Sequence, residues 1–345
     1  MSLRTQRIWV NRIAPASSRI PIRRQPQPGY DALRPTHRDA RPGRIAAALE
    51  RSQRRPSGGW FVIGQSTEVG RNHSLTRTVA GREIALWRTD NGDLRAGPGA
   101  CPHLGALLDR CPVLDGTLVC RWHGLALGDA GHGDWRPYPA HDDGALIWVR
   151  LTRPTGADPA ADPPTERPVL PARPSLSESV VAVIARRGAC EPADIIANRL
   201  DPWHGAWFHP YSFSHLTVDE AASSEDRLVT DVTFRLGRRF GVPVRAEFVS
   251  PDPRTIVMRI IDGEGVGSLV ETHATPITAP GREPAVTVMT ELTVAHSDRR
   301  GFAAALALGP LIRPAIRRVA RRLWVDDLAY AERRYRLRRR GEFPG

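Results

Sequence analysis

The chain has 345 residues and a formal net charge of +12 at pH 7. All 49 basic residues are arginine, so the excess of positive charge reflects a residue preference and does not indicate a nucleic-acid partner. Four cysteines are too few for a disulfide-stapled secreted domain, and no apolar stretch is long enough for a membrane span. We expect a cytoplasmic protein. Peripheral contact with a membrane surface or an acidic protein is the alternative use of the charge.

The first part of the chain changes character near residue 58. Residues 1–58 are rich in Arg and Pro and predict a basic N-terminal extension, flexible rather than a strap over a neighbouring domain, with a short helix at 43–52. Residues 59–151 contain short β-type runs broken by Gly, Asn and Asp, and the Asn-Gly pair within 89–93 predicts a tight hairpin. This segment is expected to form a small all-β domain.

The second half of the chain predicts a separate α+β domain. Residues 152–178 are rich in proline and are expected to form a linker to a domain at 179–345. Alternating runs there predict a five- or six-stranded antiparallel sheet with one solvated face, and the C-terminal region has a helical pattern. The glycines at 263–267 are predicted to form a turn, because no helix follows them as a nucleotide-binding fingerprint requires.

Two Cys-His pairs lie in the β domain. Cys101 and His103 are separated by one residue, Cys120 and His123 by two, and sixteen residues lie between the pairs. Two thiolates and two imidazoles would also suit zinc, although zinc sites more often use Cys-x-x-Cys pairs or two His on a helix. Two loops with this spacing match the ligand pattern of a Rieske [2Fe-2S] cluster, in which two Cys hold one iron and two His hold the other.

A second set of metal-binding residue types opens the C-terminal domain. Asp201 and His204 are three residues apart and would share one helical face, and His209 follows five residues later, which predicts a bend between the two histidines. Alone, two His beside two Trp are more often core or surface residues than ligands. The Cys-His motif upstream changes this interpretation.

Both motifs together, in this order, resemble the catalytic (alpha) subunit of Rieske-type non-heme iron oxygenases over residues 59 to about 340. The resemblance implies a helix-grip C-terminal domain, meaning an antiparallel sheet with helices around a substrate cavity. It implies that Cys101, His103, Cys120 and His123 bind the cluster, and that His204 and His209 bind Fe(II). Asn198, three residues before Asp201, belongs to the matching motif. Asp201 would bind no metal and would connect His204 to the cluster ligand His123 of a neighbouring subunit.

The resemblance also requires one carboxylate from a late helix to complete a 2-His-1-carboxylate site. The segment "VDDLAYAE" offers Asp327 or Asp326, with Glu332 five residues after the former. We choose Asp327, and Asp326 is the alternative.

The implied function is oxidation of a small molecule by O2, with electrons from a separate NAD(P)H-dependent reductase or a ferredoxin, in a head-to-tail homotrimer. A basic amphipathic pattern at 311–323 favours a lipophilic substrate, and a small aromatic acid paired with arginine is the competing prediction. Two other classes stay open: a Rieske electron carrier with a non-catalytic C-terminal binding domain, and a zinc-stabilised binding module. Three irons per chain indicate the oxygenase and two the carrier.

Overall fold

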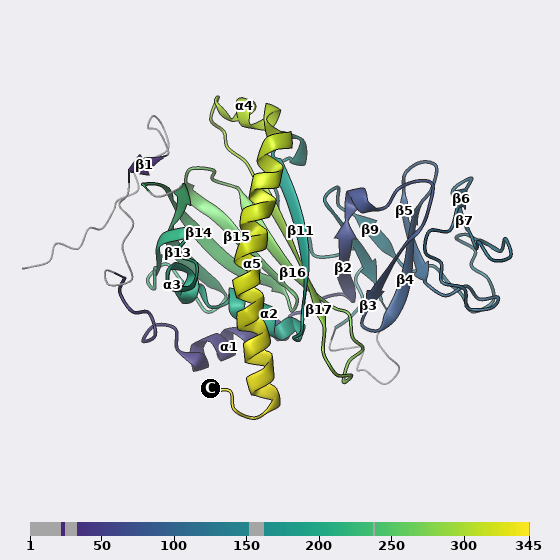
Figure 1. The fold of residues 1–345 in the computed structure, drawn as a ribbon, viewed down its shortest axis with the longest axis horizontal. Coiled ribbons are helices and arrows are strands. Elements are labelled where there is room, and N and C mark those ends of the chain that lie inside the picture. Colours follow the sequence, from purple (N-terminus) through teal and green to yellow (C-terminus); the bar gives the residue numbers. More distant parts are fainter. Residues whose placement is uncertain (1–21, 25–32, 152–161, 237–238, 345) are drawn as a thin grey trace, which may run out of the picture.

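The structure is a computed structural model that describes residues 22–24, 33–151, 162–236 and 239–344. Much of the predicted N-terminal extension (1–21 and 25–32) and the start of the predicted linker (152–161) lie outside these residues. Two bodies follow one another along the chain (Figure 1): a smaller β domain, and a larger sheet crossed by one long helix.

The β domain contains three small antiparallel sheets, with strand orders β2-β10-β9, β3-β4-β5 and β6-β7-β8. Its strands are β2 (Trp60–Gln65), β3 (Leu75–Val79), β4 (Arg82–Arg88), β5 (Leu94–Pro98), β6 (Val113–Leu114), β7 (Thr117–Val119), β8 (Ala126–Leu127), β9 (Ala140–Asp142) and β10 (Leu146–Arg150). The predicted Asn-Gly hairpin joins β4 to β5: Gly92 has φ 88° and donates its N–H to the Thr89 carbonyl at 2.8 Å. A positive φ is what makes glycine the favoured residue there.

The larger domain is built on one antiparallel sheet with the order β11-β17-β16-β15-β14-β13-β12, extended by β1 pairing with β14. Its strands are β1 (Arg23–Arg24), β11 (Val180–Gly188), β12 (Phe213–Val218), β13 (Arg227–Leu236), β14 (Phe240–Asp252), β15 (Thr255–Gly263), β16 (Leu269–Pro276) and β17 (Thr287–Ala295). The predicted count of five or six strands was therefore wrong, because β12 and β1 also join the sheet.

Helices cover one face of this sheet. They are α1 (Pro42–Gln53), α2 (Pro192–Arg199), α3 (Gly205–Phe208), α4 (Phe302–Ala307) and α5 (Gly309–Arg339). Ile195 and Ile196 of α2 pack with Trp324 and Leu328 of α5 over buried sheet residues such as Ile256. Figure 1 shows α5 running across the sheet. Within the described ranges, none of the helices combines the length and the apolar character that a membrane span requires.

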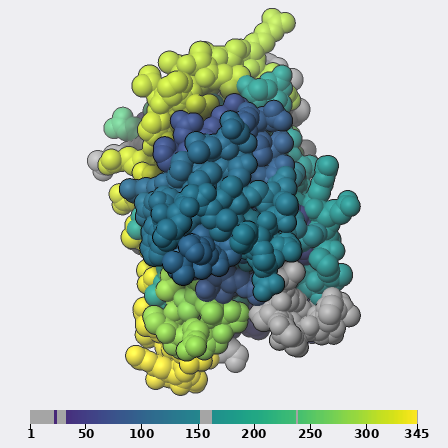
Figure 2. All heavy atoms as spheres, turned by 90° about the vertical axis from the view of Figure 1, so that its right-hand side faces the viewer, coloured from purple at the N-terminus to yellow at the C-terminus, as the bar shows by residue number. Residues whose placement is uncertain are grey.

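The opposite face of the sheet is covered only in part. Over β13 and β14 it carries charged, partly exposed pairs, Arg245 with Asp231 and Arg227 with Glu247, so the predicted solvated face is present there. Val257 and Leu292, which alternate with the helix-facing residues of their strands, pack in one buried cluster with Trp60 and Trp148 of the β domain. Figure 2, viewed from the β-domain end, shows this domain in front of the rest of the chain. Strands β15 and β17 therefore lie against protein on both faces, as the apolar residues on both sides of these two strands require.

A buried ionic cluster joins the two domains. Arg173, in the segment between them, donates from Nε and Nη2 to the two carboxylate oxygens of Glu271 on β16, at 2.5 and 2.7 Å. Its Nη1 lies 2.9 Å from Asp143 of the β domain, and the side chain of Glu271 is fully buried. Burial alone would raise the pKa of Glu271, but Arg173 and His273 hold it below its usual range. This charged cluster fixes the relative position of the domains.

Residues 33–58 form a strap on the larger domain, in contrast to the flexible arm that composition favours. The predicted short helix is present as α1, and its Ala48 and Leu49 pack against the core between α2 and α5. Arg44 of α1 forms a bidentate pair with Glu220, donating from Nη1 to Oε1 at 2.7 Å and from Nη2 to Oε2 at 2.8 Å. Just before the helix, Thr36 donates to the Trp203 carbonyl at 3.0 Å, so the strap reaches the segment that carries His204.

Candidate metal centres

Two loops of the β domain repeat one hydrogen-bonding pattern. In the first, the Gly105 N–H donates to the Cys101 carbonyl at 2.9 Å, and the Cys101 N–H donates to the carbonyl five residues later at 2.8 Å. In the second, Gly124 and Cys120 do the same, at 2.8 and 2.8 Å. The two glycines have φ values of 74° and 76°, a region in which other residues are strained. The loops are thus two copies of one tight turn.

The two turns bring the four predicted cluster ligands together as a cysteine pair and a histidine pair. Cys101 and Cys120 are 3% and 1% exposed, and the rings of His103 and His123 face each other at the surface, with 4.8 Å between centroids. Burial, together with the neighbouring Cys120 thiol, raises the pKa of Cys101, so the thiolate form calls for an adjacent cation. The donors fit a [2Fe-2S] cluster with sulfur ligands on the buried side and imidazole ligands on the exposed side.

Apolar side chains surround the two exposed imidazoles. Leu104 is 64% exposed and Trp122 57%, although both sit on the ligand loops. Cys111, the third cysteine of this region, is fully buried in the core beneath the loops and is no part of the paired turns. Exposed apolar side chains beside the histidine pair are typical of a surface that binds another protein.

The second group is assembled by α2, the turns after it, and α5. After α2 ends at Arg199, Pro202 opens a short 3₁₀ turn that carries His204, and α3 follows before His209. The predicted bend between the two histidines is therefore present. Asp194 anchors α2 to α5, because its fully buried carboxylate accepts hydrogen bonds from Arg334 at 2.5 Å and from Arg338 at 3.0 and 2.8 Å.

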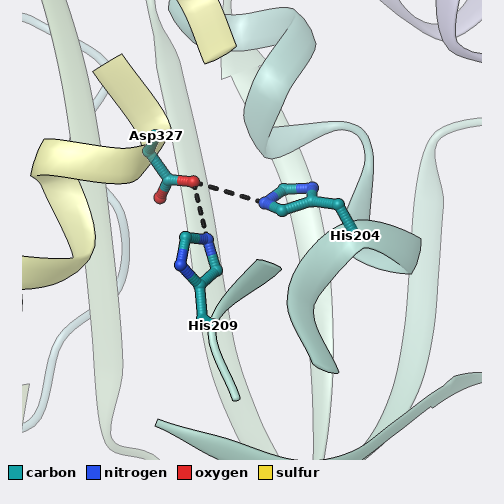
Figure 3. A group of neighbouring side chains, drawn as sticks. All are labelled: His204, His209 and Asp327. Atoms are coloured by element: carbon teal, nitrogen blue, oxygen red, sulfur yellow. Dashed lines mark hydrogen bonds and ion pairs between the residues drawn. The ribbon is translucent and has the colours of Figure 1, made fainter. Parts of the chain in front are cut away.

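A single carboxylate oxygen on α5, from Asp327, lies within hydrogen-bonding distance of both histidines (Figure 3). Oδ1 of Asp327 lies 2.9 Å from Nε2 of His209 and 3.3 Å from Nε2 of His204, and one ligand atom from each residue lies within 4.8 Å of the other two. Asn198 donates to the same oxygen at 3.1 Å. Asp327 is fully buried, and its Oδ2 has no hydrogen-bond partner among the described residues. Two imidazoles and one carboxylate at this spacing match a facial metal triad.

Electrostatics favours a cation here. Burial lowers the pKa of His204, but the Asp201 and Asp327 carboxylates outweigh that effect and raise it to about 9. Burial would raise the pKa of Asp327, yet the two histidines hold it well below its usual range. The two carboxylates thus favour positive charge beside them, and a divalent ion bound there would replace the proton of His204, since a metal ligand must give up its proton.

Asp326 faces a different partner from its neighbour. Its Oδ2 accepts the Tyr211 hydroxyl at 2.5 Å, and the same hydroxyl lies 3.2 Å from Nδ1 of His209. Asp326 therefore orients His209 through Tyr211, on the side of the ring away from Asp327. Such partners fix the tautomer and direction of a ligating histidine. Tyr211 follows His209 by two residues, but no sequence pattern marked it.

Asp201 lies behind His204. Its Oδ2 is 3.7 Å from Nδ1 of His204 and accepts the Tyr330 hydroxyl at 3.2 Å. Its Oδ1 is buried and has no partner in the described part of the chain. A buried acceptor of this kind is costly unless another group reaches it. Tyr330, three residues after Asp327 on α5, was missed by sequence reasoning although that spacing places both on one helix face.

A cavity adjoins the triad and is lined mostly by apolar side chains of β12–β15 and α5. The hollow measures about 500 Å³, a volume that counts its opening to solvent as well as the space within. The lining includes Phe213, Leu216, Val232, Phe234, Ala246, Phe248, Met258 and Leu323, together with His204, His209, Asp201 and Arg199. A mostly apolar pocket with a few polar groups at one end is the usual form of a small-molecule site.

Comparison with known families agrees with this division of the chain. The Rieske [2Fe-2S] domain family matches residues 59–151, so the β domain is a Rieske domain. The second match covers residues 159–342, more than half of the chain, and the chain belongs to that family, described as "Domain of unknown function (DUF5914)".

Several curated relatives are named as oxygenase subunits or components. The vanillate O-demethylase oxygenase subunit of Pseudomonas sp. (strain HR199 / DSM 7063) is 28% identical over 181 residues, 49% of this chain and 49% of its own. The dicamba O-demethylase oxygenase component of Stenotrophomonas maltophilia is 32% identical over 118 residues, 30% of this chain and 34% of its own. The chain thus spans about half or less of the length of these relatives.

Solved structures share the fold over most of the chain. Dicamba monooxygenase bound to dicamba superposes with a TM-score of 0.56 at 19% identity, covering 84% of this chain and 91% of that one. The 2-oxoquinoline 8-monooxygenase component gives 0.55 at 15% identity, covering 88% and 84%. The predicted fold, a Rieske domain followed by a helix-grip domain, is therefore confirmed.

Proposed function

We propose that this chain is the oxygenase component of a Rieske-type system, which uses O2 and electrons from a separate donor protein to oxidise an apolar small molecule. The observation that carries the proposal is the buried group of His204, His209 and Asp327 beside an apolar cavity. An electron carrier with a non-catalytic binding domain would not need this group of metal-binding side chains. The relatives named as oxygenase components support the same class.

The ligand assignments follow from the geometry. Cys101, Cys120, His103 and His123 would hold the [2Fe-2S] cluster. The triad would hold Fe(II), which supplies O2 activation when it is bound with open coordination positions. The rest of the site would position these groups: Asn198 and Tyr211 restrain the ligands, and the apolar lining excludes water and presents the substrate to the triad.

Electron delivery would cross between copies of the chain. Figure 1 shows the loops around β6 and β7 and the segment around α3 at opposite ends of the molecule. Asp201 has a buried, unpartnered oxygen next to His204, which supports a hydrogen bond from His123 of the partner subunit. Such a head-to-tail contact closes into a ring, and a homotrimer is the expected size.

The electron donor is proposed to be a reductase or ferredoxin, because no nucleotide-binding fingerprint is present in the sequence. The substrate is proposed to be lipophilic or aromatic, in keeping with the lining of the cavity. An aromatic acid is the second candidate, favoured by one observation: Arg199 lines the cavity, and its Nε has no hydrogen-bond partner among the described residues, while its Nη1 lies 4.0 Å from Asp327.

Iron counting with two adjacent aspartates tests the proposal. The reconstituted wild-type chain should hold three irons, two in the cluster and one in the triad. Asp327→Asn should hold two and keep the cluster spectrum, whereas Asp326→Asn, the matched control, should still hold three because Asp326 faces Tyr211. A wild-type count of two with an intact cluster spectrum would instead establish the electron carrier.

A further inference from the structure

The first half of α5 turns an apolar stripe toward solvent. Leu308, Leu311 and Val319 are 52%, 74% and 56% exposed, and Ala315 between them is also exposed. Their spacing of three, four and four residues places them on one side of the helix. The helix also has apolar residues that turn inward and are half-buried, such as Ile312 and Ile316. The outward stripe is therefore additional to the one that packs against the domain.

Positive charge accompanies the stripe. The segment from Arg299 to Val325 contains seven arginines and no acidic residue. Arg299 pairs with Glu264, whereas Arg318 and Arg321 are exposed, lie beside the stripe in helical phase, and form no ion pair among the described residues. Such a helix, with an exposed apolar row flanked by arginine, matches those that lie in the interface of a bilayer.

The stripe belongs to the same helix as the cavity wall. Leu323, one turn beyond Val319, lines the cavity. The Arg322 guanidinium lies 4.2 Å from the centroid of the Tyr211 ring, whose hydroxyl contacts His209. The α4 end of α5 forms one extremity of the molecule (Figure 1), where the Rieske domain does not cover it, as the view from the Rieske end also shows (Figure 2).

We propose that Leu308, Leu311, Ala315 and Val319, with Arg318 and Arg321, form a docking surface for an anionic lipid bilayer. The positive charge of the segment favours a lipid bilayer over a second copy of the chain as the binding partner of this surface. Two copies that paired stripe to stripe would oppose arginine with arginine, whereas acidic headgroups supply a counter-charge for Arg318 and Arg321. A head-to-tail contact between copies would be detected by sedimentation without lipid. The helix would lie on the membrane, with its apolar row among the acyl chains and its arginines at the headgroups.

This surface deepens the proposed function, because it would bring the cavity to a membrane in which a lipophilic substrate dissolves. Vesicle binding itself does not depend on the iron chemistry, so the two proposals fail separately: the metal count tests the oxygenase, and lipid partition tests the surface.

Vesicle co-sedimentation of the metal-loaded full-length chain tests the surface. The protein should bind vesicles of phosphatidylcholine mixed with phosphatidylglycerol, should bind phosphatidylcholine alone far more weakly, and should be released by salt. Arg318→Gln should weaken partition about fivefold, since each arginine near an anionic surface contributes about 1 kcal/mol. Leu311→Gln should weaken it about tenfold by removing an apolar contact.

Val266→Gln is the matched control, since Val266 is 45% exposed in the turn between β15 and β16, outside the stripe. It should leave partition unchanged. Equal binding to both kinds of vesicle, no binding, or equal losses in the control and in Leu311→Gln would overturn the proposal. A change in sedimentation coefficient for Leu311→Gln without lipid would also overturn it, because the stripe would then be an interface between copies.

Discussion

Asp194 is the residue whose removal best tests how the triad is assembled. Its carboxylate is fully buried and accepts hydrogen bonds from Arg334 and Arg338 of α5, and it also receives the Glu191 N–H at 3.2 Å at the start of α2. The substitution Asp194→Ala leaves Arg334, whose side chain is only 10% exposed, without its counter-charge. Removing one partner of a buried ion pair costs about 3–5 kcal/mol.

Loss of the helix cap adds to this cost, but the two effects share one side chain and are not additive, so we expect a total of about 4 kcal/mol. Urea unfolding followed by circular dichroism measures it. Asp129→Ala is the control, because its carboxylate also pairs with an arginine, Arg95, but is 69% exposed. An exposed pair contributes about 0–1 kcal/mol.

The Asp194→Ala substitution should affect the mononuclear iron site and leave the cluster unaffected. α2 leads into the segment of His204 and α5 carries Asp327, so loosening their contact should lower mononuclear iron content and leave the cluster spectrum intact. If Asp194→Ala destabilised the protein no more than the control does, or if cluster and mononuclear iron fell together, the anchoring role would be wrong.

Three further outcomes are expected. His103→Ala should abolish the visible spectrum of the cluster while mononuclear iron is retained; retention of the spectrum would remove His103 from the ligand set. Gly97→Val should destabilise the Rieske domain, because even a Cβ there would lie 2.5 Å from the Trp135 ring, and an unchanged melting temperature would refute this. Glu271 has a lowered pKa, so its stabilising effect is present above its ordinary value of 4.5 and is lost as the pH falls through the lower folded-state pKa. Glu271→Gln should therefore unfold with a weaker dependence on acid pH, which stability measured against pH would show.

Sequence motifs predicted the centres better than the packing around them. Spacing identifies Cys101 and His103 because both ligands sit in one tight turn, which is a local property. The strap at 33–58 has no comparable signal, since it is held by distant partners such as Glu220. The covered part of the second face was missed for the same reason: alternation shows that a face is apolar or polar, but the Rieske domain that packs on part of it belongs to another part of the chain.

The choice between Asp326 and Asp327 shows where a local signal did exist. Neighbouring residues on an α-helix point about 100° apart, so both cannot face one metal. Trp324, Leu328 and Ala331 are buried with the spacing of one helix face, and Asp327 falls within that face. Asp326 falls outside it and reaches Tyr211 instead. The pair therefore serves one site in two ways: the inner carboxylate receives both imidazoles, and the outer one orients one of them through a tyrosine. A segment that offers two adjacent acids to a metal site should be resolved by the helical phase of its apolar neighbours, because burial decides which acid can meet the ligands on the other elements.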